Sequence, residues 1–208
     1  MNHSRRITAL LLIVSVLVPC FTGCHKEPTT PEEFEMGEEN LPYGATMKSD
    51  KTSYGVPVTY DRRFVTKEQI SAVADLCTAI QNQDGGLYAV ITPEGYADYQ
   101  VNEVYSYEST DEMMQALHSS IAQNTAEDFN FSMVLVNGVS DDIHFGGLVE
   151  AVALMDNLTE NQFSASMLGA WDFTVEWDFT YENDTKSTIV DEQHIYVFQT
   201  PNGYYAMM

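Results

Sequence analysis

Residues 171–182 have the sequence WDFTVEWDFTYE, in which apolar and polar side chains alternate without interruption. The apolar members are mostly aromatic, and most of the polar members are carboxylates. A period of two is typical of an antiparallel strand with one face in the core and the other in water. We therefore expect a half-buried strand, with Asp172, Glu176 and Asp178 solvated on the face opposite the aromatic side chains.

The flanking segments predict further strands of the same sheet. Residues 183–184 supply Asn-Asp turn chemistry, and residues 189–200 are expected to return as a partner strand. A Pro-Asn-Gly turn at 201–203 then leads into a short last strand over 204–208. Upstream, residues 129–136 alternate strongly enough to predict another strand.

A capping box formed by Thr66 and Gln69 predicts the start of an amphipathic helix. The helix pattern ends near residues 84–86, Asp-Gly-Gly. Its apolar face follows at spacings of three and four and comprises Ile70, Val73, Cys77 and Ile80. On this face Cys77 is expected to be a small core residue and not a nucleophile.

A second helix is predicted after Ser109 or Thr110, whose hydroxyls suit an N-cap. Its apolar stripe comprises Met113, Met114, Leu117 and Ile121, which we interpret as core-filling side chains. A third, short helix is expected over 147–158. Residues 87–92 favour either a strand or an extension of the first helix, and residues 99–105 are expected to be extended.

Helices followed by a long sheet predict an α+β fold, with N-terminal helices packed on a curved antiparallel sheet in a cone-like arrangement. Residues 66–208 form the predicted single domain, which is long enough to bury one core. Residues 46–65 are expected to be an extended arm that packs on it. Residues 24–45 contain Pro and a cluster of Glu, which predicts a flexible acidic tether.

The chain is strongly acidic, with 31 Asp and Glu against 9 Lys and Arg and a formal net charge of −22. Lys186 is the only Lys or Arg after Lys67. A domain with so few cations cannot neutralise phosphates, so nucleic acid is excluded as a partner. The negative charge either keeps the protein soluble, or it attracts cations or a basic partner.

The first 24 residues combine three features in a fixed order. Arg5 and Arg6 form a basic start, residues 7–18 are almost wholly apolar, and residues 21–24 are Phe-Thr-Gly-Cys. This order resembles a bacterial lipoprotein signal, with the lipobox at 21–24. The family usually has Leu, Val or Ile where this chain has Phe21.

The resemblance implies that residues 1–23 are a signal peptide and that the mature chain begins at an acylated Cys24. The lipid would anchor the protein in the bilayer, on the extracytoplasmic face of the cell membrane. An ordinary secretory signal, with Cys24 incidental, is the alternative. The apolar run over 7–22 falls short of the roughly 20 residues that a membrane-spanning helix needs.

The order of elements in the predicted domain also resembles that of a known superfamily. Its first helix runs into residues 79–84, AIQNQD, and its last strand begins at residues 202–205, NGYY. This order is similar to the nuclear transport factor 2-like, cystatin-like superfamily, in which helices pack into the concave side of a long sheet. The resemblance implies a fold and carries no activity with it.

Some enzymes of that superfamily use a carboxylate or a His inside the cone as general base. A Tyr or an acid serves there as hydrogen-bond donor. The residues considered for such roles here are His118, His144, His194, Asp172 and several tyrosines. Asp141, Asp142 and His144 are also candidate metal ligands, although a solvated loop before a helix is the commoner cause of such a cluster. The sequence contains no phosphate-binding loop, zinc Cys pair or nucleophile motif, and no cofactor is expected.

These patterns predict a membrane-anchored surface lipoprotein that acts as a non-enzymatic binding or accessory module. Its ligand would be a small apolar molecule in the cone, or a protein partner would bind the sheet. The alternative is a small cofactor-free enzyme, an isomerase, dehydratase or hydrolase, with its site inside the cone. Converging polar groups in a pocket would favour catalysis, whereas a solidly packed cone would exclude both a ligand and a reaction there.

Overall fold

The alternating stretch forms β4 (Gly169–Tyr181), an interior strand of a six-stranded sheet in this computed structural model. The structure describes residues 37, 40–122, 128–144, 146–181 and 186–208, and the helices and strands named below lie within them. The chain divides into two units, Met1–Leu41 and Pro42–Met208, and all of these elements belong to the second.

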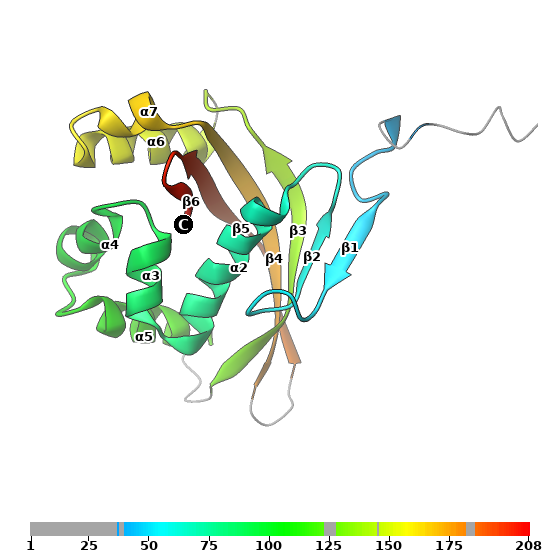
Figure 1. The fold of residues 1–208 in the computed structure, drawn as a ribbon. Coiled ribbons are helices and arrows are strands. Elements are labelled where there is room, and N and C mark those ends of the chain that lie inside the picture. The colour runs from blue at the N-terminus through cyan, green and yellow to red at the C-terminus, as the bar shows by residue number, and fades with distance from the viewer. Residues whose placement is uncertain (1–36, 38–39, 123–127, 145, 182–185) are drawn as a thin grey trace, which may run out of the picture. The chain divides into compact units, whose positions relative to one another are not determined.

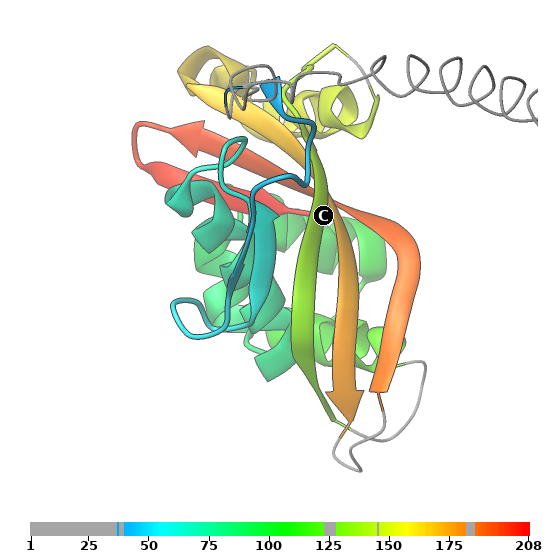
Figure 2. The same cartoon turned by 90° about the vertical axis from the view of Figure 1, so that its right-hand side faces the viewer.

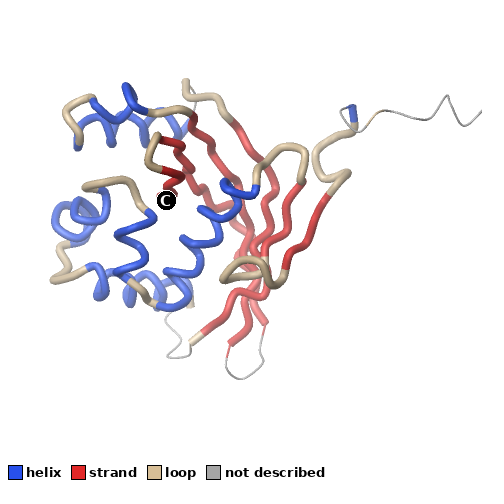
Figure 3. The backbone as a smooth tube through the Cα atoms, in the orientation of Figure 1, coloured by secondary structure: helices blue, strands red, loops and turns tan. Residues whose placement is uncertain are grey.

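The sheet is built in sequence order. Its strands are β1 (Met47–Asp50), β2 (Val58–Asp61), β3 (Phe129–Ser140), β4, β5 (Lys186–Thr200) and β6 (Gly203–Met207). The helices are α2 (Lys67–Asn82), α3 (Gly85–Ile91), α4 (Tyr96–Tyr99), the π-helix η4 (Gln100–Tyr105), α5 (Thr110–Ile121), α6 (Gly146–Leu158) and α7 (Gln162–Ser166). Helices α2 to α5 lie together on one side of the sheet (Figures 1 and 3). The predicted α+β class is confirmed.

The two-residue period of β4 is confirmed by its burial pattern. Phe173, Val175, Trp177 and Phe179 are at most 1% exposed, while the polar residues between them are half-buried. β3 and β5 pair with β4 on either side, both antiparallel. Figure 2 shows the three long strands curving together, with the helices behind them. The buried face of β4 therefore forms one side of the hydrophobic core.

Helix α2 begins at the predicted capping box. The Thr66 hydroxyl accepts a hydrogen bond from the Gln69 amide at 3.3 Å, and the Gln69 side chain accepts one from the Thr66 amide at 2.7 Å. Its predicted apolar face is fully buried. Burial raises the pKa of Cys77 to about 12, so at neutral pH this thiol is a protonated core group.

The sheet is mixed and not purely antiparallel, because β2 pairs with β3 in parallel. The register joins Val58 to Val134 and Thr59 to Leu135. The connection between β2 and β3 contains helices α2 to α5, and a crossover of this kind brings the chain back in the same direction. Residues 46–65, predicted as an arm on the domain, thus contribute two strands to its sheet.

The prediction of extended structure over 99–105 is wrong. This segment is helical, as the end of α4 and the π-helix η4. Tyr and Val favour strands when considered locally. Tyr96, Ala97 and Val101 are nevertheless buried in the helical layer, and this tertiary packing overrides the local preference.

Helices α6 and α7 cover the other face of the sheet at one end. The Phe163 ring of α7 packs edge-on against Phe198 of β5, with ring centroids 5.1 Å apart. The backbone of Gly147 in α6 lies so close to Tyr196 that an added Cβ would be 1.8 Å from the tyrosine hydroxyl. Because side chains alternate along a strand, Phe198 and Tyr196 lie on the face opposite Val197 and Ile195.

Near the start of this unit, a buried carboxylate holds several neighbouring groups together. Asp61, which is 0% exposed, forms an ion pair with Arg63 at 3.0 Å. It also accepts hydrogen bonds from the Thr46 hydroxyl at 2.6 Å and the Gly44 amide at 2.9 Å. The Arg63 guanidinium donates further to the Pro42 carbonyl at 2.7 Å. Together these groups, with Arg63 first, hold the pKa of Asp61 well below its usual range.

We predict that Asp61→Asn lowers the free energy of unfolding by about 3 kcal/mol at pH 7, since it leaves a largely buried guanidinium without its charge partner. The folded-state pKa of Asp61 lies below the unfolded value of about 3.9, so its contribution is complete above that pH. It is lost as the pH falls toward the folded pKa, and the gap between the two proteins narrows. Urea unfolding at pH 7 and pH 3 measures both effects. Asp98→Asn, at an exposed carboxylate, is the matched control, and equal losses for the two variants would contradict the prediction.

Candidate functional site

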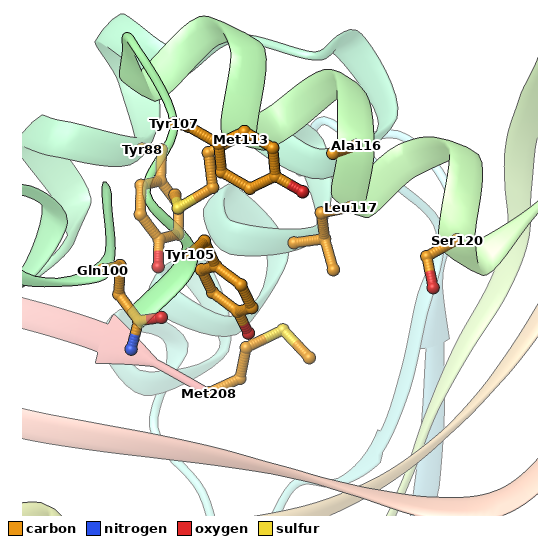
Figure 4. Close-up of a pocket in the computed structure, with 9 residues that line it drawn as sticks. All are labelled: Tyr88, Gln100, Tyr105, Tyr107, Met113, Ala116, Leu117, Ser120 and Met208. Carbon is orange, nitrogen blue, oxygen red and sulfur yellow. The ribbon is translucent and has the colours of Figure 1, made fainter. Parts of the chain in front are cut away.

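A pocket with a cavity volume of about 290 Å³ opens in the helical layer. It lies between α3, η4 and α5, beside the residue that follows β6 (Figure 4). Its lining consists of Tyr88, Gln100, Tyr105, Tyr107, Met113, Ala116, Leu117, Ser120 and Met208. Small-ligand pockets are typically concave, aromatic or apolar, and provided with a few polar groups.

The first wall of the pocket is set by a close approach of α3 to α5. The Asp84 side chain caps α3 by accepting a hydrogen bond from the Leu87 amide at 2.8 Å. The Gly85 amide donates to the Asp111 carboxylate at the start of α5, at 3.0 Å. A Cβ at position 85 would lie 2.4 Å from that carboxylate and 2.5 Å from the Asp111 amide, so only glycine permits this approach. Tyr88 follows one turn later and faces the pocket.

The π-helix supplies the second wall. Gln100 and Tyr105 stand at its two ends, five residues apart, which is the spacing of the i→i+5 hydrogen bond that defines a π-helix. The helix ends at Ser106, whose φ of 58° is left-handed, and the Tyr107 amide then donates to the Val101 carbonyl at 3.0 Å. This turn brings Tyr105 and Tyr107 together, with ring centroids 5.9 Å apart. π-Helical turns are rare and often occur at functional sites.

The third wall is one face of α5, which begins at the predicted cap. The Ser109 hydroxyl accepts a hydrogen bond from the Glu112 amide at 3.1 Å. The four residues of α5 in the lining follow at spacings of three, one and three, as one helix face requires. Met113 points into the pocket (Figure 4), whereas its neighbour Met114 is fully buried in the core. Both methionines are buried in the core, as predicted, and Met113 also lines the pocket.

Buried tyrosines complete the site. The Tyr96 hydroxyl donates to the Met208 carbonyl at 2.5 Å and so holds the residue after β6 against the pocket. Burial raises the pKa of Tyr88 and of Tyr96 far above the usual range. These phenols are therefore protonated at neutral pH.

The lining of the pocket is uncharged. None of its nine residues is Asp, Glu, His, Lys, Arg or Cys. Its polar groups are tyrosine hydroxyls, the Gln100 amide and the Ser120 hydroxyl.

The concave face of the sheet, where the sequence predicts the site, is filled by aromatic rings. Phe129 contacts Phe131 and Phe179 with centroids 5.3 and 5.2 Å apart. Phe131 in turn packs on Trp177 at 5.5 Å. These rings occupy the interior over β3 and β4. The pocket lies elsewhere, within the helical layer.

His118, a candidate general base from the sequence, is buried and turned into the core. Its ring stacks on Phe129 with centroids 4.2 Å apart, and its Nδ1 lies 3.1 Å from the Ile80 carbonyl oxygen. Its Nε2 lies 3.5 Å from the Asp128 carboxylate. These contacts are those of a packed helix residue, and His118 does not reach the pocket lining.

The candidate metal ligands Asp141, Asp142 and His144 lie on the exposed loop between β3 and α6. The Asp142 carboxylate accepts a hydrogen bond from the His144 amide at 3.0 Å, which is a local turn contact. Among the residues that the structure describes, no three His, Cys, Asp or Glu side chains are grouped so that they could hold a metal ion.

Asp172 and His194 meet on the sheet face opposite the aromatic rings. An Asp172 carboxylate oxygen lies 2.8 Å from His194 Nδ1. The His194 ring stacks near Tyr196, with centroids 6.4 Å apart. Glu176, on the same face, accepts a hydrogen bond from the Asn137 amide at 2.5 Å. The expected polar face is therefore present, but Asp172, Glu176 and Asp178 are half-buried and not fully solvated as predicted.

Comparison of the chain with protein-family models, with curated proteins and with solved structures found no match. The resemblance of the domain to the nuclear transport factor 2-like superfamily therefore stays a prediction from the sequence. The lipobox and Cys24 lie outside the described residues. Within the described part of the chain, no helix has both the length and the apolar character needed to cross a membrane.

Proposed function

We propose that this protein is a lipid-anchored binding module of the bacterial cell surface, and that its pocket between α3, η4 and α5 takes a small ligand with apolar surface. The observation that carries the proposal is the pocket lining. Three tyrosines, two methionines and a leucine surround a cavity of about 290 Å³, together with a few uncharged polar groups. This combination offers apolar contact and orienting hydrogen bonds.

An enzymatic function has less support. The histidine and aspartate candidates for catalysis, His118, His144, His194 and Asp172, all lie outside the pocket lining. Of the candidate residue types, only tyrosines line the pocket. The alternative of a cofactor-free isomerase, dehydratase or hydrolase inside the cone would need space where the Phe131–Trp177 contact lies. Binding without chemistry is the simpler function for this site.

The anchor in this proposal is the acylated Cys24, followed by the predicted tether over 24–45. A surface with so few Lys and Arg is not drawn to anionic lipid headgroups. Attachment to the membrane would therefore depend on the lipid and not on a basic patch. Stable attachment then depends on two or more acyl chains.

We predict that Ala116→Trp strongly weakens ligand binding, because an indole at this half-buried position occupies space in the cavity. N-phenyl-1-naphthylamine, a neutral apolar dye, should bind the unmodified protein saturably and bind Ala116→Trp at least about tenfold more weakly. Fluorescence titration measures both affinities.

Ala153→Trp is the matched control, since it places the same side chain at an exposed position of α6. It should bind the dye as the unmodified protein does. Circular dichroism confirms that both variants are folded. Dye binding that Ala116→Trp leaves unchanged would contradict the proposed site.

We predict that Cys24→Ala prevents incorporation of radiolabelled palmitate and releases the protein from the membrane fraction, because the acyl chains are the proposed attachment. Cys20→Ala is the control and should leave labelling intact, since Cys20 lies in the predicted signal peptide. Persistent labelling of the Cys24→Ala variant would refute the anchor.

A further inference from the structure

The pocket has a second property beyond its apolar surface. The rings of Tyr88, Tyr105 and Tyr107 line the same pocket and lie near one another in Figure 4. Tyr88 comes from α3, whereas Tyr105 and Tyr107 come from the end of η4 and the turn after it. An aromatic ring presents a negative face, and a cation held against several such faces is attracted by all of them.

The electrostatic surroundings of the pocket favour the same class of ligand. The segment that supplies Gln100, Tyr105 and Tyr107 carries five exposed carboxylates, at Asp98, Glu103, Glu108, Asp111 and Glu112. It contains no Lys or Arg, and Lys186 is the only one anywhere after Lys67. The resulting negative field raises the local concentration of cations and repels anions.

The type of cation follows from what the lining omits. No carboxylate faces the cavity, so a strongly hydrated ammonium would lose its water without gaining an ion pair. A quaternary ammonium spreads its charge over methyl groups and is recognised by aromatic faces alone. Its alkyl groups also suit contact with Met113, Leu117 and Met208.

We infer that the pocket selects an organic cation, a trimethylammonium-type group on a short uncharged chain. This inference deepens the proposed function and rests on it, because it names the chemical class of the ligand in the same cavity. Tyr105 is well placed for a test, since it is 55% exposed at the rim and its replacement removes little from the core.

The experiment compares choline with 3,3-dimethylbutan-1-ol, which replaces the ammonium nitrogen by carbon and leaves the shape unchanged. Calorimetric titration of the purified protein should show tighter binding of choline. Tyr105→Leu should reduce that preference by about 2- to 30-fold, the range of one cation–π contact. Tyr105→Phe, which keeps the ring, should preserve it.

The outcomes separate this inference from the proposed function. Equal affinity for the two compounds, or tighter binding of the alcohol, overturns selection for a cation and leaves an apolar pocket. The inference also fails if neither compound binds while N-phenyl-1-naphthylamine still does. Failure of the dye to bind as well removes the proposed function itself.

Discussion

The two-residue period of β4 is the constraint on which the rest of this structure depends. It directs Phe173, Val175, Trp177 and Phe179 to one face, and no other arrangement of the strand buries all four. Helix α2 packs over that face, and its own fully buried stripe completes the core. Helices α3 and α5 then contact α2, and they form the outer layer in which the pocket opens.

This layering separates the core from the candidate site. The rings of Phe129, Phe131 and Trp177 fill the space over the long strands and fix the sheet. The pocket is bordered by short helices, which depend on packing more than on intrinsic helix propensity.

The sequence was informative where structure is decided by near neighbours. The alternation over 171–181, the capping box at Thr66 and the cap at Ser109 involve residues at most four apart, and all three are present. The parallel pairing of β2 with β3 joins residues 76 apart, such as Val58 and Val134, and no local pattern encodes it. The π-helix was missed because its residues favour strands locally.

The pocket was missed for a related reason. Tyr88, Tyr105 and Tyr107 belong to segments without a clear period, and only the tertiary packing brings them together. The sequence contained only an indirect sign of the pocket. Residues 96–112 hold several tyrosines and carboxylates and no Lys or Arg. The candidate histidines were easier to notice, yet His118 belongs to the core and His194 to the opposite face of the sheet.

The central claim is that ligand enters the helical layer and not the space over β4. Amide hydrogen exchange with and without N-phenyl-1-naphthylamine tests it most directly. Bound dye should slow exchange in residues 85–121 and leave residues 169–181 unchanged. Protection along β4 and β5 with none in residues 85–121 would contradict the account.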